Sequence, residues 1–333
     1  MNQTGKNAAA VGLDVGTSHI VVARQSDEGF RFESQLNGFV DIPYAKLTEK
    51  VLQMENIPHC VDGSRIAVQG NESGQLAELL KVEPRRPMSH GFLNPSEPES
   101  LERISRIIGA LCGIAGDGEG PLYFSVPAVS IGEQDHWTYH EATLRQVLGE
   151  LGYAAKSITE GLAIVYSEME SSNYTGIGIS CGGGLCNVCL AYLSVPVMSF
   201  SIPKAGDFID RNVASVTGER ANSIRLIKEA SFHFNGNFAD KIHQALGVYY
   251  DDMIGTLVAT IKDQFQSCRG LPPLGRPIPL VLSGGSAIPR GFKDRFKAIL
   301  KESDFPVPIS EVRMAEDPLH ATARGALVAA MIE

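Results

Sequence analysis

The chain has 333 residues, of which 44% are hydrophobic and 20% charged, and its formal net charge is −9. This acidic balance excludes the basic footprint that a nucleic-acid-binding protein needs. Six cysteines do not make a disulfide framework in a chain of this length, so we expect reduced thiols.

The N-terminal segment "MNQTGKNAAAVGLDVG" has no apolar core of signal-peptide length and no amphipathic, membrane-seeking face. No run in the sequence approaches the ~18 apolar residues of a membrane-spanning helix. We therefore expect a cytoplasmic protein without direct membrane insertion, which can still have a membrane-associated protein partner.

The first half of the chain opens with "AVGLDVGTSHIVVARQ", the apolar run, small-residue turn and apolar run of a β-hairpin. A strand at "FRFES" follows, and then a small inserted subdomain with a strand at "SRIAVQG" and a helix at "GQLAELLKV". Helix-start residues at "SEPE" predict a helix over "ESLERISRIIGALCGI". The buried strand "PLYFSVPA" and a helix from about Glu133 to Leu151 complete this half.

The second half repeats the plan, since "YTGIGISCGGGLCNVCLAYLS" is again strand, glycine turn and strand. A strand at "VPVMSFSIP" comes next. Helices are predicted over "GDFIDRNVASVTG", over "ERANSIRLIKEASFHF" and from about Phe238 to Arg269. The strand "PIPLVLSGG" precedes a helix over "IPRGFKDRFKAILKES" with proline near its first turn, and "DPLHATARGALVAAMIE" is the last helix. Two similar halves with three glycine turns indicate a duplicated domain around a cleft.

Glycine turns let successive backbone N–H groups point at one oxygen, because no Cβ blocks its approach. Each turn alone is explained by chain reversal, but three together favour a phosphate clamp. Asp14 stands just before the first turn and could hold hydrated Mg²⁺, which takes one or two protein carboxylates. The candidate nucleotide-binding residues in the turns are Gly16, Thr17, Ser18, Gly182, Gly183, Gly184, Gly284, Gly285 and Ser286.

Three other sequence patterns are weaker signals of a functional site. Cys181, Cys186 and Cys189 lack the paired spacing of a zinc site and are expected to be small buried strand residues. His136 and His140 share one helix face, which we expect to be solvated. The segment "GISCG" matches a nucleophile elbow, but a strand rather than a helix follows it, which disfavours a hydrolase.

The segments "GLDVGTS", "ISCGGGLCNV" and "LVLSGGSAIPRG" resemble, in this order, the two phosphate motifs and the adenosine motif of the actin, sugar-kinase and heat-shock-chaperone ATPase superfamily. "RRPMSHGFLN", "SIPKAGDFIDRNV" with Gly206, and the helix "GERANSIRLIKE" are similar to segments of bacterial actins such as MreB and MamK. The resemblance implies an α/β fold of duplicated actin-like, ribonuclease-H-like domains around a central nucleotide cleft that binds ATP and Mg²⁺.

This resemblance also assigns roles to individual residues, and the chain departs from the family pattern at several of them. The second phosphate motif usually reads Asp-x-Gly-Gly-Gly-Thr-x-Asp, and here Ser180, Leu185 and Asn187 replace two acids and the threonine, which leaves Asp14 as the only evident metal carboxylate. In bacterial actins the water-orienting residue follows the proline of the connecting strand, and counting from Pro127 places it at Gln134, beside Glu133. An acidic first helical turn explains these two residues equally well. The ribose and base contacts fall at Ser223 or its neighbour Asn222, and at Arg225.

The likeness predicts lobe I at residues 10–174, with the inserted subdomain at about 37–84. Lobe II is predicted at 175–315, and the terminal helix 316–333 returns to lobe I. We expect an actin-like ATP-binding protein that polymerises into cytoskeletal filaments and hydrolyses ATP slowly. The alternative is a hydrolysis-deficient nucleotide-binding adaptor of a bacterial division or surface-assembly complex. A small-molecule kinase is a weaker third reading, since no substrate-side aspartate base is evident.

Overall fold

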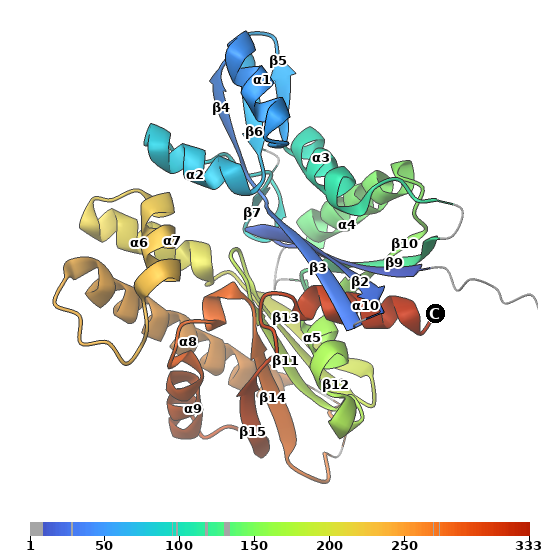
Figure 1. Cartoon of the computed structure of the whole chain (residues 1–333). Helices are drawn as coiled ribbons and strands as arrows, with labels where there is room; N and C mark the ends of the chain where they lie inside the picture. Colours follow the sequence, from blue (N-terminus) through green and yellow to red (C-terminus); the bar gives the residue numbers. More distant parts are fainter. Residues whose placement is uncertain are drawn as a thin grey trace, which may run out of the picture.

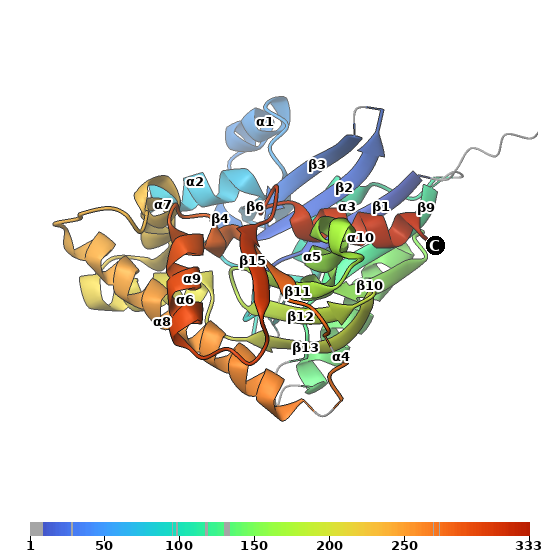
Figure 2. The same ribbon diagram turned by 90° about the horizontal axis from the view of Figure 1, so that it is seen from below.

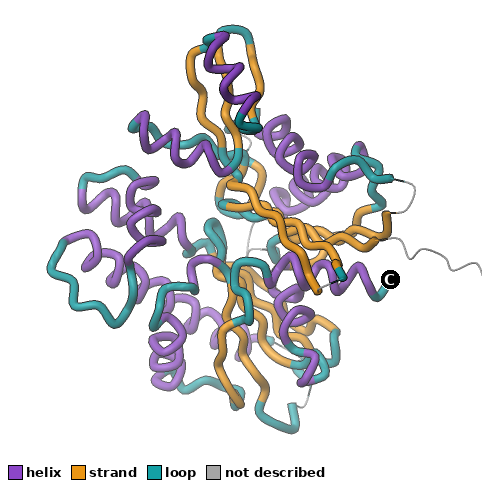
Figure 3. Tube along the Cα trace, in the orientation of Figure 1, coloured by secondary structure: helices purple, strands orange, loops and turns teal. Residues whose placement is uncertain are grey.

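A computed structural model describes residues 9–27, 29–94, 96–97, 99–116, 119–129, 134–268, 270–272 and 274–333. Two five-stranded sheets form the centres of two lobes, with helices around them (Figures 1 and 3). The sheet of lobe I contains β1 (Ala9–Val15), β2 (His19–Ser26), β3 (Gly29–Leu36), β9 (Glu119–Val126) and β10 (Ala155–Thr159). The sheet of lobe II contains β11 (Gly176–Cys181), β12 (Cys186–Tyr192), β13 (Val195–Ile202), β14 (Ile278–Ser283) and β15 (Ile309–Met314).

The two sheets have the same topology. Their orders are β10-β9-β1-β2-β3 and β15-β14-β11-β12-β13, so each contains an antiparallel hairpin beside two parallel strands. Parallel neighbours need crossover helices, and these cover the sheets. The helices are α3 (Ser100–Cys112) and α4 (Gln134–Glu150) in lobe I, and α6 (Gly206–Thr217), α7 (Ala221–Ser231), α8 (Lys241–Ser267) and α9 (Phe292–Glu302) in lobe II. The predicted duplication and the α/β fold class are confirmed.

Each lobe has its own apolar core. In lobe I, Leu13 and Phe124 of the sheet pack against Ile104 of α3 and Leu144 of α4. In lobe II, a larger core joins the sheet to α6, α8 and α9. The small subdomain consists of a three-stranded sheet and two helices: β4 (Phe39–Pro43), α1 (Lys46–Met54), β5 (His59–Asp62), β6 (Arg65–Gln69) and α2 (Asn71–Leu80). A two-stranded ribbon, β7 (Met88–Ser89) and β8 (Phe92–Leu93), follows it.

Two short helices join the lobes. α5 (Glu160–Glu168) packs on β11 and β12 of lobe II, α10 (Ala321–Met331) packs on β1 and β9 of lobe I, and the two helices lie against each other (Figures 1 and 2). A Cβ at Gly325 of α10 would overlap the carbonyl of Ala163 in α5. The helices therefore cross at a distance that only glycine allows.

The predicted hairpins and long helices are all present, but three details differ. Sequence reasoning missed β4, α1 and β5 in the small subdomain, the ribbon of β7 and β8, and β10, α5 and β15. Pro289 lies before α9, which begins at Phe292 after Gly291 with φ 92°, so proline does not open this helix. A short 3₁₀ turn, η2 (Gly285–Ala287), lies between β14 and α9. Within the described ranges, no helix is long and apolar enough to cross a membrane.

Candidate functional site

The first glycine turn connects β1 to β2 and is fixed by backbone contacts. The N–H of Gly16 donates to the carbonyl of His19 at 3.0 Å. The fully buried Asn37 donates from Nδ2 to the carbonyl of Gly16 at 2.9 Å, and its own N–H donates to the carbonyl of Ser18 at 2.8 Å. Thr17 Oγ1 accepts the N–H of Gly91 at 3.1 Å. The turn is thus held from both of its ends.

The second glycine turn connects β11 to β12 and meets the third. The carbonyl of Gly182 accepts Ser286 Oγ at 2.8 Å and the N–H of Gly206 at 3.1 Å. Gly284 has φ 88°, and a Cβ there would overlap the carbonyl of Cys181. The predicted adenosine turn and the start of α6 therefore lie directly against the second phosphate turn.

The first and second turns also converge across the lobes. A Cβ at Gly183 would overlap Ser18 Oγ, and a Cβ at Gly184 would lie 2.5 Å from Thr17 Oγ1 and overlap the backbone of Gly91. Only glycine permits this approach. The structure therefore brings all the predicted residues of the three turns, and Gly206, into one region between the lobes. The N–H groups of Gly16 and Gly182 bond carbonyls within their own turns. The absence of Cβ atoms on the glycines still suits the close approach of phosphate oxygens to this backbone.

Two buried carboxylates stand beside these turns. Asp14, at the end of β1, accepts a hydrogen bond from Ser125 Oγ at 2.6 Å, and burial raises its pKa to about 6. Glu160, the first residue of α5, has its pKa raised to about 8 by burial and by the nearby charge of Asp14. Two desolvated acids at one site favour a bound cation, because a cation removes the cost of their charge. The donor set fits Mg²⁺.

Glu160 is the residue that sequence reasoning missed. Ser180 Oγ donates to Glu160 Oε2 at 2.9 Å, and Ser180 lies opposite Asn187 across the hairpin. The two positions where acids were expected therefore surround an acid that comes from another element. The signal in the sequence was "SITEGLA", an acid at the change from strand to helix.

The connection from β9 to α4 is attached to the second hairpin. The N–H of Ala128 donates to Asn187 Oδ1 at 2.9 Å, and Ser201 Oγ donates to the carbonyl of Ala128 at 3.0 Å. Gln134 begins α4, while Glu133 lies outside the described residues. Asn187 thus holds Ala128, just after β9, against the second hairpin.

The predicted ribose and base contacts lie on α7, where it faces the small subdomain. Ser223 Oγ donates to Glu78 Oε2 at 3.2 Å, and Arg225 donates to Glu229 at 3.0 Å and to Asn222 Oδ1 at 3.1 Å. Burial lowers the pKa of His19, and the charges of Arg225 and Arg86 lower it further, although Glu229 opposes them. Arg225 therefore acts on His19, beside the first turn, through its charge, whereas Ser223 bonds Glu78 of α2.

The weaker patterns are resolved as follows. Cys181 and Cys186 face the core of lobe II and Cys189 the opposite side, all buried and free, and the described residues contain no group of three metal ligands. A hydrogen bond with Cys181 and burial raise the pKa of Cys186. Ser180 lies inside a hairpin, so the nucleophile elbow is excluded. The prediction of a solvated face is wrong for His140, which is fully buried and has its pKa lowered to about 4 by desolvation.

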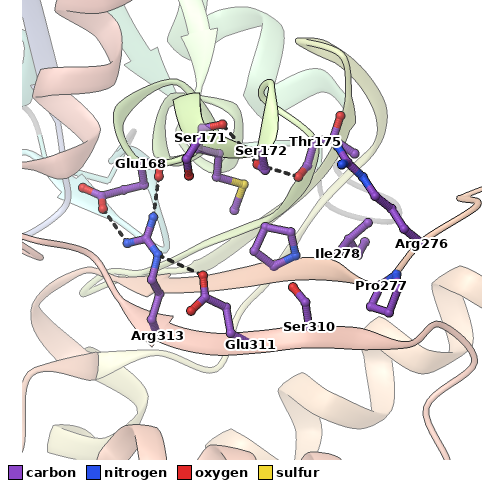
Figure 4. A pocket seen from close by; sticks show the side chains of 12 residues that line it. Glu168, Ser171, Ser172, Thr175, Arg276, Pro277, Ile278, Ser310, Glu311 and Arg313 are labelled. Carbon is purple, nitrogen blue, oxygen red and sulfur yellow. Dashed lines mark hydrogen bonds and ion pairs between the residues drawn. The ribbon is translucent and has the colours of Figure 1, made fainter.

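A separate pocket of about 210 Å³ lies at the N-terminal ends of β14 and β15 (Figure 4). Its wall contains Arg313, whose Nη1 bonds Glu168 Oε2 at 2.8 Å. Ser171, Arg276 and Glu311 also line it. None of the predicted site residues is in its lining, so we assign the nucleotide site to the glycine turns instead.

A family model built on known proteins matches nearly the whole chain. The Volactin family model matches residues 9–330. The chain belongs to the volactin family. No curated protein matches it.

Solved structures are similar to this chain over nearly its whole length. A MamK double helical filament has a TM-score of 0.73 and 18% identity, with 98% of this chain and 99% of that chain covered. A non-polymerising MamK mutant bound to AMPPNP has a TM-score of 0.59, 18% identity and the same coverage. The ethanolamine utilization protein EutJ from Carboxydothermus hydrogenoformans has a TM-score of 0.57 and 14% identity, with 96% of this chain and 89% of that chain covered. The predicted actin-like fold and the resemblance to bacterial actins are confirmed.

Proposed function

We propose that this chain binds ATP with Mg²⁺ between its lobes and polymerises into filaments, with slow hydrolysis. The observation that carries the proposal is the convergence of three glycine turns, in which Gly182 contacts Ser286 and Gly206 while Gly184 meets Thr17. Turns from both lobes would grip one phosphate chain, and binding would then hold the lobes together.

The proposed metal site uses Asp14 and Glu160. Mg²⁺ keeps several waters and takes one or two carboxylates, so these two are sufficient. The bound ion would supply charge neutralisation for the phosphates. Asp14 would face it from lobe I. Glu160, held by Ser180 of lobe II, would face it from the other side. Gln134 would orient the attacking water from the start of α4.

Self-association is supported by the likeness to the MamK filament over nearly the whole chain. A filament needs a heterologous contact, in which one surface of a subunit binds a different surface of the next. In this proposal, filament growth depends on nucleotide because a nucleotide bound by turns of both lobes would fix their relative position, and with it the geometry of the two surfaces.

A second candidate is a nucleotide-binding adaptor that does not hydrolyse ATP. The observation that favours it is the pair Ser180 and Asn187, since neither side chain brings a charge to the metal. Lobe closure, rather than turnover, would then be the signal to a membrane-associated partner.

One paired measurement separates these candidates. We expect sedimentation of the protein to require ATP and Mg²⁺, with slow phosphate release from the same sample. Sedimentation without release would favour a non-hydrolysing filament. Binding of nucleotide without either would support the adaptor, and absence of nucleotide binding would overturn both.

A further inference from the structure

An ion pair joins the two lobes beside the glycine turns. Arg86 Nη1 donates to Asp207 Oδ1 at 2.7 Å. Arg86 follows the small subdomain on the lobe I side, and Asp207 lies in the first turn of α6 in lobe II. The two side chains are only 23% and 21% exposed, so water screens the pair less than it screens a surface salt bridge.

Asp207 also bonds the second glycine turn through its backbone. Its N–H donates to the carbonyl of Gly183 at 2.8 Å, and its Oδ1 lies 3.7 Å from the position of a Cβ on Gly183. A carboxylate here would repel a phosphate unless a cation neutralises it. Burial alone would raise the pKa of Asp207, but Arg86 lowers it below its usual value, so the acid is charged and paired.

The segment that carries Arg86 touches the first turn as well. Gly91 donates to Thr17 Oγ1, and His90 Nε2 lies 3.2 Å from Arg211 Nη2 of α6. Arg85 points the other way, into a cluster of lobe I acids with Asp41 and Glu97. Of these two arginines, Arg86 is therefore the one that links the lobes.

We propose that Arg86 and Asp207 form a latch that holds the lobes together before nucleotide binds and keeps the second phosphate turn free of uncompensated negative charge. Arg86 is a positioning residue in this role. The lobe-closing part stands alone, whereas the charge part rests on the proposed nucleotide function.

The test compares Arg86→Gln and Asp207→Asn. Both variants break the latch, so small-angle scattering of nucleotide-free protein should show a larger radius of gyration for each. Their effects on AMPPNP binding with Mg²⁺ should differ. Arg86→Gln removes the cation that acts most strongly on Asp207 and leaves only the charges of Lys228 and Arg211, so it should weaken binding about tenfold, the change that 1.4 kcal/mol produces. Asp207→Asn removes that carboxylate and should not weaken binding.

The control is Arg295→Gln, which breaks an ion pair of 2.7 Å with Asp251 that lies within lobe II and should change neither readout. Arg86→Lys keeps the charge and should retain affinity, which covers the case in which the glutamine variant does not fold. An unchanged radius of gyration in both latch variants would overturn the latch. An equal loss of affinity in both would overturn the charge role. A wild-type protein that does not bind AMPPNP would refute the proposed function, while the scattering result still decides the latch.

Discussion

The two hairpins at the centre of the molecule have the same backbone but different chemistry. Gly12 of β1 packs against the carbonyl of Ala323 in α10, and Gly178 of β11 packs against the carbonyl of Gly161 in α5. These matching contacts make Asp14 the counterpart of Ser180, two residues further along each strand. They also make Thr322 the counterpart of Glu160, one residue earlier on each helix.

The acid and the hydroxyl have therefore exchanged elements between the lobes. In lobe I the strand provides the carboxylate, and in lobe II the helix provides it. What looks in the sequence like a missing acid is a carboxylate supplied from α5. The degenerate second motif thus argues less strongly against hydrolysis than its residues alone indicate.

The largest expected effect comes from removing Asp14, the carboxylate on the strand of lobe I. Asp14→Ala should weaken Mg²⁺-dependent nucleotide binding by about 3 kcal/mol, or roughly 100-fold, because the bound ion would lose one of its two proposed carboxylates. Ser180→Ala at the matching position should weaken binding much less, since it removes a hydroxyl that holds Glu160 and no metal carboxylate. Titration of a fluorescent ATP analogue with and without Mg²⁺ checks both. Equal losses in the two variants would contradict the exchange of roles.

The sequence predicted the parts of this comparison that depend on local pattern. The hairpins follow from apolar runs interrupted by glycine, and the long helices from their apolar spacing. α5 was missed because Gly161, Ala163, Ile164 and Val165 are buried on several sides, so the helix has no polar face that reveals its period.

The remaining site features depend on tertiary contacts. Glu160 meets Ser180 only after β10, α5 and β11 have folded together, and no spacing in the sequence shows that pairing. Similarly, the spacing of His136 and His140 places them on one face but does not show that the protein buries His140.

The helix acid should control the pH dependence of stability. The pKa of Glu160 is about 8 in the folded protein against an ordinary 4.5. Its contribution to the free energy of unfolding is therefore present at low pH and is lost as pH rises through this window, by up to about 1.4 kcal/mol per pH unit. Asp14, with a pKa raised to about 6, has the same sign over a narrower range.

Glu160→Gln removes the larger of these titrations. Urea unfolding in EDTA at about pH 5.5 and about pH 8.5 should show a smaller difference for the variant than for the wild type. Mg²⁺ should stabilise the wild type most at the higher pH, where both acids are ionised. An identical pH slope in the two proteins would mean that Glu160 is not the titrating group.

The approach of the two turns can be tested with a single methyl group. A Cβ at Gly184 would lie 2.5 Å from Thr17 Oγ1 of the first turn and overlap the backbone of Gly91, whereas a Cβ at Gly182 meets only the Leu185 carbonyl at 3.1 Å. Gly184→Ala should therefore reduce stability by about 2 kcal/mol, and Gly182→Ala by clearly less. Thermal unfolding measures both. A larger loss at Gly182 would show that the hairpins are not in contact as described.

The smallest expected effect concerns how the first glycine of each turn is held. Gly16 and Gly182 are counterparts, and the carbonyl of each accepts a side-chain hydrogen bond, from Asn37 and from Ser286. Gly182 has a second donor, the N–H of Gly206, which remains when Ser286 is removed. Asn37→Ala should thus cost about 1.5 kcal/mol of stability and Ser286→Ala about 0.5 kcal/mol, because only the first leaves a carbonyl without its donor. Urea unfolding of the two variants measures the difference. A greater cost for Ser286→Ala would mean that the hydroxyl, rather than the Gly206 N–H, holds the second turn in place.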